Sequence, residues 1–389
     1  MMPNFDEIIP RENTDCLKYD DKMHRFGTLD VDPMWVADMD FKVPDFITNS
    51  FQKLINHGIY GYHIKTDRYY NSIIEWYKRR HNYLINKEDI FFTPGVVPAI
   101  SYLIQALTEK GDKIIVQPPV YYPFFSVVKM NGRQVEYNQL VEKNNLYTFD
   151  FDDLEEKAKS AKMLIFCNPH NPVGRVWKKQ ELERVADICI RNNVIIVSDE
   201  IHNDLVFEPH KHISMASLSP EVDNITITCH AASKTFNLAG LSTGYVFMRN
   251  AELKSIFKKY HTNLHVDGLN TFGLVSMVEA YNHGEPWLNE LKIYLTDNYN
   301  FIKQYLNKNL PKIKISPLEA TYMVWLDFRG YSMDDSKLKQ FIIEKAKLGL
   351  NDGPTFGLGG SGFQRINIAC PRVQIQKALE NLKNAVESL

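Results

Sequence analysis

The stretch NVIIVSDE, residues 193–200, passes from four apolar residues directly into a serine and two acids. Short apolar runs rich in valine and isoleucine recur along the middle of the chain: DKIIVQPP (112–119), KMLIFCNP (162–169), NITITCH (224–230) and GYVFMRN (244–250). Stretches with helical periodicity, such as KKQELERVADICIRN (178–192), lie between some of these runs. Continuous apolar strands that alternate with helices predict a mostly parallel sheet covered on both faces, and therefore an α/β fold.

The pattern changes near residue 286. A long helical stretch at about 287–309 precedes two apolar runs and two further helical stretches: TYMVWLDF (321–328), a helix near 335–348, FQRINIA (363–369) and a closing helix from about 372. This part predicts a smaller α+β domain. We expect a large domain at 46–285 and a small domain made of residues 1–45 and 286–389.

Charge and cysteine usage exclude several classes of protein. The formal net charge of the 389 residues is −2, without the basic excess of a nucleic-acid-binding protein. The five cysteines form no CxxC pair and no zinc-ligand spacing, which predicts free thiols in a reducing compartment and no metal site. The start of the chain, MMPNFDEIIPREN, lacks the apolar core of a signal peptide, and no long apolar run predicts a membrane span. We expect a cytoplasmic protein without nucleic-acid or membrane partners.

The residues just after the apolar runs are the candidates for a binding site, because ligands of parallel sheets lie beyond the carboxyl ends of the strands. Asp199 ends such a run, and Lys234 lies among small and hydroxyl residues in HAASKTFNLAGLSTGY (230–245). Gly95 precedes an expected helix start, where free backbone N–H groups can hold a phosphate. A lysine, an acid, a phosphate loop and a tyrosine are the set that pyridoxal 5'-phosphate (PLP) requires, since the lysine forms a Schiff base and the acid keeps the ring nitrogen protonated.

Two glycine motifs lack the context that their usual function needs. GLGGSG (357–362) matches the dinucleotide pattern GxGxxG, but a strand-like run follows it instead of a helix, so a loop is expected and a nicotinamide dehydrogenase is disfavoured. GLSTG (240–244) matches the nucleophile pattern GxSxG, but Ser242 also precedes a strand-like run instead of a helix.

Seven ordered motifs resemble one family: WVADMDF (35–41), TPGVVPAI (93–100), QPPVYYPF (117–124), NPHNPVGRVW (168–177), SDEIHNDL (198–205), SKTFNLAGL (233–241) and FQRINIACPR (363–372). The chain resembles the fold-type I PLP enzymes of the class I/II aminotransferase superfamily, and within it the bacterial cystathionine β-lyase (C–S lyase) branch. The resemblance covers nearly the whole chain and implies the aspartate aminotransferase-like fold.

The resemblance also implies a role for individual residues. Lys234 matches the Schiff-base lysine that moves protons at the substrate Cα, and Arg365 matches the arginine that binds the substrate α-carboxylate. The other implied contacts are all with the cofactor: Asp199 with the pyridine nitrogen, Tyr121 stacked on the ring and assisting catalysis, Asn171 with the phenolic oxygen, Gly95, Val96, Val97 and Ser233 with the phosphate, His202 near the ring, and Tyr62 reaching the phosphate of a neighbouring subunit. The last role implies a homodimer with shared active sites.

Each of these residues taken singly also has an ordinary structural explanation. Lys234 could be a surface lysine, Tyr121 a core aromatic residue and Asn171 a turn residue beside Pro172. It is their joint occurrence that favours the PLP site.

Two departures from the general aminotransferase pattern indicate the branch. A histidine, His202, stands where a tyrosine is usual, and Ser242 stands where a phosphate-binding arginine is usual. The implied reaction is α,β-elimination of L-cystathionine and cysteine-like thioethers to a thiol, pyruvate and ammonia. Two alternatives stay open from the sequence: an aminotransferase on the same scaffold, and a regulatory interaction protein.

Overall fold

The computed structural model describes residues 3–266, 268 and 270–389, and its centre is a mixed sheet. Across the described residues this sheet has seven strands in the order β2 (Ile90–Thr93), β10 (Gly244–Phe247), β9 (Thr226–His230), β8 (Ile195–Asp199), β7 (Ala161–Cys167), β3 (Lys113–Val116) and β4 (Gln134–Tyr137). Strands β9, β8, β7, β3 and β4 are parallel, whereas β10 runs antiparallel to both β9 and β2. The α/β prediction is confirmed.

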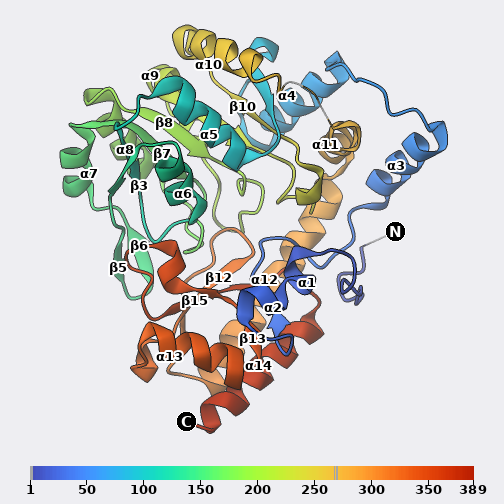
Figure 1. Ribbon diagram of the computed structural model, residues 1–389, viewed down its shortest axis with the longest axis vertical. Helices are drawn as coiled ribbons and strands as arrows, with labels where there is room; N and C mark the ends of the chain where they lie inside the picture. The colour runs from blue at the N-terminus through green and yellow to red at the C-terminus, as the bar shows by residue number, and fades with distance from the viewer. Residues whose placement is uncertain (1–2, 267, 269) are drawn as a thin grey trace.

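Helices cover both faces of the central sheet (Figure 1). One face packs against α5 (Val96–Leu107), α6 (Pro123–Met130) and α10 (Ala251–Asn263), and the other against α7 (Phe151–Ala158), α8 (Lys179–Arg191) and α9 (Pro220–Ile225). Neighbouring residues of a strand point to opposite faces of the sheet. In β7, Ile165 is buried on the face covered by α5, α6 and α10, whereas Leu164 and Phe166 are buried on the face covered by α7, α8 and α9. Both faces are buried, which is why these strands are continuously apolar.

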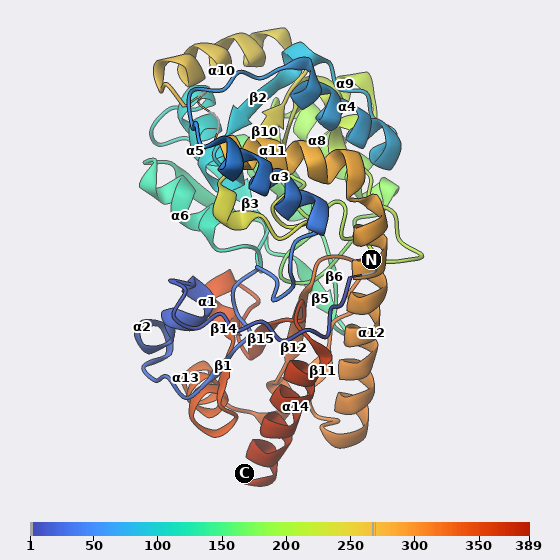
Figure 2. The same ribbon diagram turned by 90° about the vertical axis from the view of Figure 1, so that its right-hand side faces the viewer.

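Beyond the β10–β2 edge, α11 (Thr271–His283) packs against α3 (Asp45–His57) and α4 (Asp67–His81). Helix α12 (Glu285–Asn309) then runs from this layer down into the lower half of the molecule (Figure 2). It matches the helix expected at 287–309.

The lower half contains an antiparallel sheet with the order β11 (Lys314–Ile315), β12 (Met323–Asp327), β15 (Phe363–Asn367) and β14 (Asn351–Asp352). The helix expected near 335–348 is shorter: α13 (Asp335–Gln340) continues as a π-helix at Phe341–Lys345, and β13 (Leu348–Gly349) follows. The closing helix is α14 (Arg372–Glu387).

The N-terminal segment lies beside this C-terminal sheet (Figure 2). It forms α1 (Leu17–Asp20), α2 (Lys22–Phe26) and β1 (Asp32–Pro33), and β1 pairs in parallel with β13. This pairing supports joining the N-terminal segment to the small domain, while the boundaries 46–285, 1–45 and 286–389 stay a prediction.

The remaining regular structure is short. It comprises the hairpin β5 (Val141–Lys143) and β6 (Leu146–Thr148), and 3-10 turns at Lys87–Asp89, Met215–Ser217, Ala239–Leu241, Arg329–Tyr331 and Gly353–Phe356. GLGGSG forms the loop expected for it, with Gly357, Gly359 and Gly362 at positive φ, and β15 follows it.

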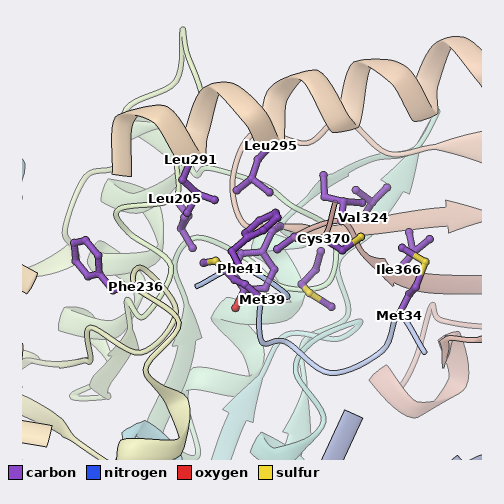
Figure 3. Packing of buried hydrophobic residues seen from close by; sticks show 14 of the residues in the cluster. Met34, Met39, Phe41, Leu205, Phe236, Leu291, Leu295, Val324, Ile366 and Cys370 are labelled. Carbon is purple, nitrogen blue, oxygen red and sulfur yellow. The ribbon is translucent and has the colours of Figure 1, made fainter. Parts of the chain in front are cut away.

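A buried apolar cluster ties the N-terminal segment to the rest of the molecule. Figure 3 shows Met39 and Phe41 beneath Leu291 and Leu295 of α12, close to Val324 of β12. Met34, Met39 and Phe41 are therefore part of the core. Within the described chain, no helix has the length and apolarity to cross a membrane, and no group of three or more His, Cys, Asp or Glu residues could hold a metal.

Candidate active site

A cavity of about 200 Å³ lies where β7 and β8 end and where the chain leaves β9. Most of the residues expected from the sequence line it: Gly95, Val96, Val97, Tyr121, Asn171, Asp199, His202, Ser233 and Lys234. Residues far apart in the chain meet here because the parallel strands deliver their carboxyl ends to one edge of the sheet.

Lys234 projects into this cavity from the turn that follows β9. Its Nζ donates a hydrogen bond to the carbonyl oxygen of Ala37 at 2.7 Å. Burial lowers the pKa of Lys234 to about 8, with the nearby carboxylate of Asp38 as the largest opposing influence. A substantial fraction of the amine is therefore neutral near physiological pH, which is the form that can act as a nucleophile or a base.

Asp199 is the last residue of β8 and is buried at the floor of the cavity. Its Oδ1 accepts a hydrogen bond from the backbone N–H of Ile201 at 3.1 Å. Burial raises the pKa of Asp199 to about 7, although the Ile201 hydrogen bond and the charge of Lys234 act in the opposite direction. No described side chain forms an ion pair with this carboxylate, so the site has room for a ligand N–H that would stabilise its charged form.

The N-terminus of α5 forms another wall of the cavity. Gly95 precedes the helix with φ 137°, a conformation that favours glycine, and the N–H groups of Val96 and Val97 belong to the first turn. Free N–H groups at a helix start attract an anion. Lys234 is the only lysine or arginine among the described lining residues, and Ser233, Ser242 and Thr243 surround the rest of this wall.

Gly244 allows this wall to approach closely. A Cβ at Gly244 would lie 3.2 Å from both the Cα of Gly95 and the carbonyl oxygen of His230. A larger residue would press the turn before α5 away from β9, so the close packing of β10 helps to place the helix start.

Arg365 lies behind the cavity, in the middle of β15. Its Nη1 donates to Oδ1 of Asn171 at 2.9 Å, and its Nη2 donates to the carbonyl oxygen of Trp35 at 3.1 Å and to Oδ1 of Asn351 at 2.6 Å. Its Nε has no partner within the described structure, and burial lowers the pKa of Arg365 to about 10. A buried guanidinium without a carboxylate partner among the described residues is suited to a ligand carboxylate.

The contact between Asn171 and Arg365 also orients the Asn171 amide. Because Oδ1 of Asn171 accepts from Arg365, its Nδ2 is the group left to donate into the cavity.

His202 and Tyr121 complete the wall with two uncharged rings. Burial lowers the pKa of His202 to about 3, so this imidazole is neutral, and its ring meets Tyr322 edge to face at 6.0 Å. Burial raises the pKa of Tyr121 to about 12, and its ring packs against Phe124 at 5.8 Å.

Tyr62 does not line this cavity. It is fully exposed in the segment 58–66 between α3 and α4, and Ile59, Tyr60 and Ile64 of the same segment are also exposed. The expected contact of Tyr62 with the phosphate of a neighbouring subunit concerns a second copy of the chain and stays a prediction.

Sequence reasoning assigned no function to several residues that the structure brings to the site. Ala37 and Asp38 approach Lys234, Cys167 lines the cavity, and Trp35 and Asn351 hold Arg365. Ala37 and Asp38 belong to the motif WVADMDF (35–41), one of the seven motifs that carry the family resemblance. Nothing in the local sequence of this motif shows that it faces Lys234.

Comparisons with known proteins agree with this geometry. The sequence model described as aminotransferase class I and II matches residues 45–382. The chain belongs to this family. It is 41% identical to cystathionine beta-lyase PatB of Bacillus subtilis (strain 168), over 98% of this chain and 100% of that protein.

Two solved structures share the fold over almost the entire chain. A PLP-bound protein of Clostridium difficile 630, named as a candidate aminotransferase, is 45% identical with a TM-score of 0.97, over 99% of this chain and 100% of the other. Cystalysin from Treponema denticola, which contains a pyridoxal 5'-phosphate cofactor, is 36% identical with a TM-score of 0.97, over 100% of both chains.

Proposed function

We propose that this protein is a PLP-dependent carbon–sulfur β-lyase that eliminates a thiol from L-cystathionine and cysteine-like thioethers, releasing pyruvate and ammonia. One observation carries the proposal. A single cavity combines the weakly basic Lys234 with the carboxylate of Asp199, and the guanidinium of Arg365 lies one residue away, across Asn171. Neither Asp199 nor Arg365 has an ion-pair partner among the described residues. The similarity to cystathionine beta-lyase PatB supports this choice of reaction.

The residues present fit the functional groups of PLP. The start of α5 and Ser233 would hold the phosphate, Asp199 the ring nitrogen, and Nδ2 of Asn171 the phenolic oxygen. Tyr121 would cover the ring and Lys234 would bind the aldehyde carbon. When bound, PLP supplies an electron sink that stabilises negative charge at the Cα of an attached amino acid.

Lys234 carries the proton transfers in this proposal. Its pKa of about 8 places a neutral amine near the working pH, as general-base catalysis requires. The amine removes the proton from the substrate Cα, and the resulting ammonium can return a proton to the sulfur as the Cβ–S bond breaks. Tyr121 lies in the same cavity, and its O–H group is a second proton donor for the departing thiol.

Arg365 orients the substrate. Its planar guanidinium can bind the α-carboxylate with two parallel hydrogen bonds, which fixes the direction of the Cα–H bond relative to Lys234. The neutral His202 brings no further cation into the site, so the charge that balances the substrate carboxylate comes from Arg365.

A homodimer with shared sites is part of the proposal. The exposed run of Ile59, Tyr60, Tyr62 and Ile64 is an apolar surface of the kind that a second subunit covers. In such a dimer Tyr62 would reach the phosphate wall of the partner. We also propose a cytoplasmic location, because each of the five cysteines is free in the described structure.

The decisive experiment uses purified protein with added PLP and L-cystathionine, and no keto acid. We expect pyruvate and free thiol in equal amounts, lost in Lys234→Ala and retained in Lys259→Ala, which removes an exposed lysine of α10. Amino transfer to an added keto acid without pyruvate release would instead identify an aminotransferase. A protein that takes up no PLP would refute the proposal.

A further inference from the structure

The segment Trp35–Phe41, here called the N-terminal strap, crosses the site as a row of carbonyl groups. The carbonyl oxygens of residues 35–38 accept hydrogen bonds from site residues or their neighbours: Trp35 from Arg365, Val36 and Asp38 from Asn367, and Ala37 from both Lys234 and Tyr322. The carbonyl oxygens of Met39 and Phe41 accept from Asn237, and that of Met39 also from Arg11. Met39 and Phe41 anchor the strap in the core beneath α12 (Figure 3). The strap is therefore a fixed wall of the site.

An ion cluster holds the first acid of the strap in place. Arg11 binds Asp38 through two parallel hydrogen bonds, Nη1 to Oδ1 at 3.2 Å and Nη2 to Oδ2 at 2.7 Å. Arg11 also binds Asp40 at 2.6 Å, and the buried Lys18 binds Asp40 at 2.7 Å and lies 3.9 Å from Asp38. This paired arginine restricts the Asp38 carboxylate to one orientation.

Asp38 acts on both groups that donate to Ala37. Its carboxylate raises the pKa of Lys234 against the effect of burial, and it contributes to the raised pKa of Tyr322. Two other charges act on the Lys234 amine in opposite directions: Arg365 disfavours the ammonium form, and Asp199 favours it. His202, across the cavity, is neutral.

We propose that Asp38 is a positioning residue of the site, which keeps Lys234 able to carry a proton while the neighbouring Ala37 carbonyl holds its amine. The inference rests on the proposed function for its purpose, because a lysine that takes a proton from Cα and returns one to sulfur must populate both forms. In a cavity that disfavours charge, Asp38 supplies the negative charge that preserves the ammonium form.

Two substitutions that break the same ion pair distinguish electrostatic tuning from loss of structure. Asp38→Asn removes the negative charge that faces Lys234. Arg11→Gln breaks the same ion pair but leaves the negative charge of Asp38 in place, and that charge is then no longer neutralised by Arg11. Asp40 retains Lys18 as its partner in both variants. Loosening of the strap would affect the two variants alike, whereas electrostatics would lower the pKa of Lys234 in Asp38→Asn and not in Arg11→Gln.

The main readout is the pH dependence with which limiting acetic anhydride labels Lys234 in the full-length, cofactor-free protein, followed by peptide mass spectrometry. Only the neutral amine reacts. We expect Asp38→Asn to lower the midpoint by about one pH unit, and Arg11→Gln to leave it unchanged or raise it. The acidic limb of the kcat/KM profile of the PLP-loaded protein should move in the same directions.

An unchanged midpoint in Asp38→Asn would overturn the inference, and so would an equal shift of the same sign in both variants. The labelling result is independent of turnover. A shifted midpoint in a protein without lyase activity would therefore refute the proposed function and leave the influence of Asp38 on Lys234 standing.

Discussion

Asparagine in place of Asp199 is expected to stabilise the cofactor-free protein at alkaline pH. The wild-type carboxyl group is buried without an ion-pair partner in the described structure, and its pKa is raised to about 7. The amide of asparagine has nearly the same shape and can still accept the hydrogen bond from the backbone N–H of Ile201. The substitution therefore removes the cost of a buried charge with little change in packing.

The magnitude follows from the difference between the two pKa values. An aspartate in the unfolded chain has a pKa of about 4, which is about 3 pH units below the pKa of Asp199 in the folded protein. Folding therefore disfavours the charged carboxylate by about 4 kcal/mol. Because its pKa is higher, Asp199 keeps its proton to a higher pH in the folded state than in the unfolded state. Stability is therefore lost as pH rises from about 4 to about 7, and the loss is complete above that window. Between pH 5 and pH 8 the advantage of Asp199→Asn should grow by about 3 kcal/mol.

Urea unfolding of the cofactor-free protein at these two pH values measures this difference. Asp152→Asn is the matched control, since the Asp152 side chain is fully exposed and should show no comparable pH-dependent gain. Added PLP should reverse the ranking, because only the wild-type carboxylate can pair with a protonated ring nitrogen. A stability difference between wild type and Asp199→Asn that is the same at pH 5 and pH 8 would refute the reasoning.

Three further substitutions test the site, the assembly and the fold. Arg365→Lys should raise KM for L-cystathionine by about tenfold to a hundredfold, because an ammonium cannot form the two-pronged contact with a carboxylate; an unchanged KM in steady-state assays would remove Arg365 from substrate binding. Tyr62→Phe should weaken PLP binding by about tenfold, because one hydrogen bond to a charged group is lost. The melting temperature of the cofactor-free protein should not fall, since the Tyr62 ring is exposed in the single chain. Equal PLP affinity of variant and wild type in a fluorescence titration would count against the shared site. Gly353→Ala should lower the free energy of unfolding by about 2 kcal/mol or more, because the new Cβ would lie 1.8 Å from the carbonyl oxygen of Gly360. Thermal unfolding measures this loss. The control is Gly240→Ala, which should be neutral because no atom lies within 4 Å of its Cβ position.

Local sequence patterns were sufficient to predict five strands of the central sheet (β3, β7, β8, β9 and β10) and most of the cavity, but not the edge strands β2 and β4. Apolar runs such as 193–197 become strands, and the polar residues that follow them meet because parallel strands share one edge for their carboxyl ends. Gly95 could also be placed before a helix start from its local sequence, and α5 begins at Val96. The resemblance of seven motifs then indicated the roles of Lys234 and Asp199.

The sequence by itself therefore determined the fold class and the residues at the strand ends, because both depend on spacing within a few residues. Only the tertiary structure decided what surrounds them. The contact of Lys234 with Ala37 spans 197 residues and that of Arg365 with Asn171 spans 194, and neither leaves a local pattern. The pKa of Lys234 and that of Asp199 also depend on burial and on charges brought in from other elements, so they exist only once the chain has folded.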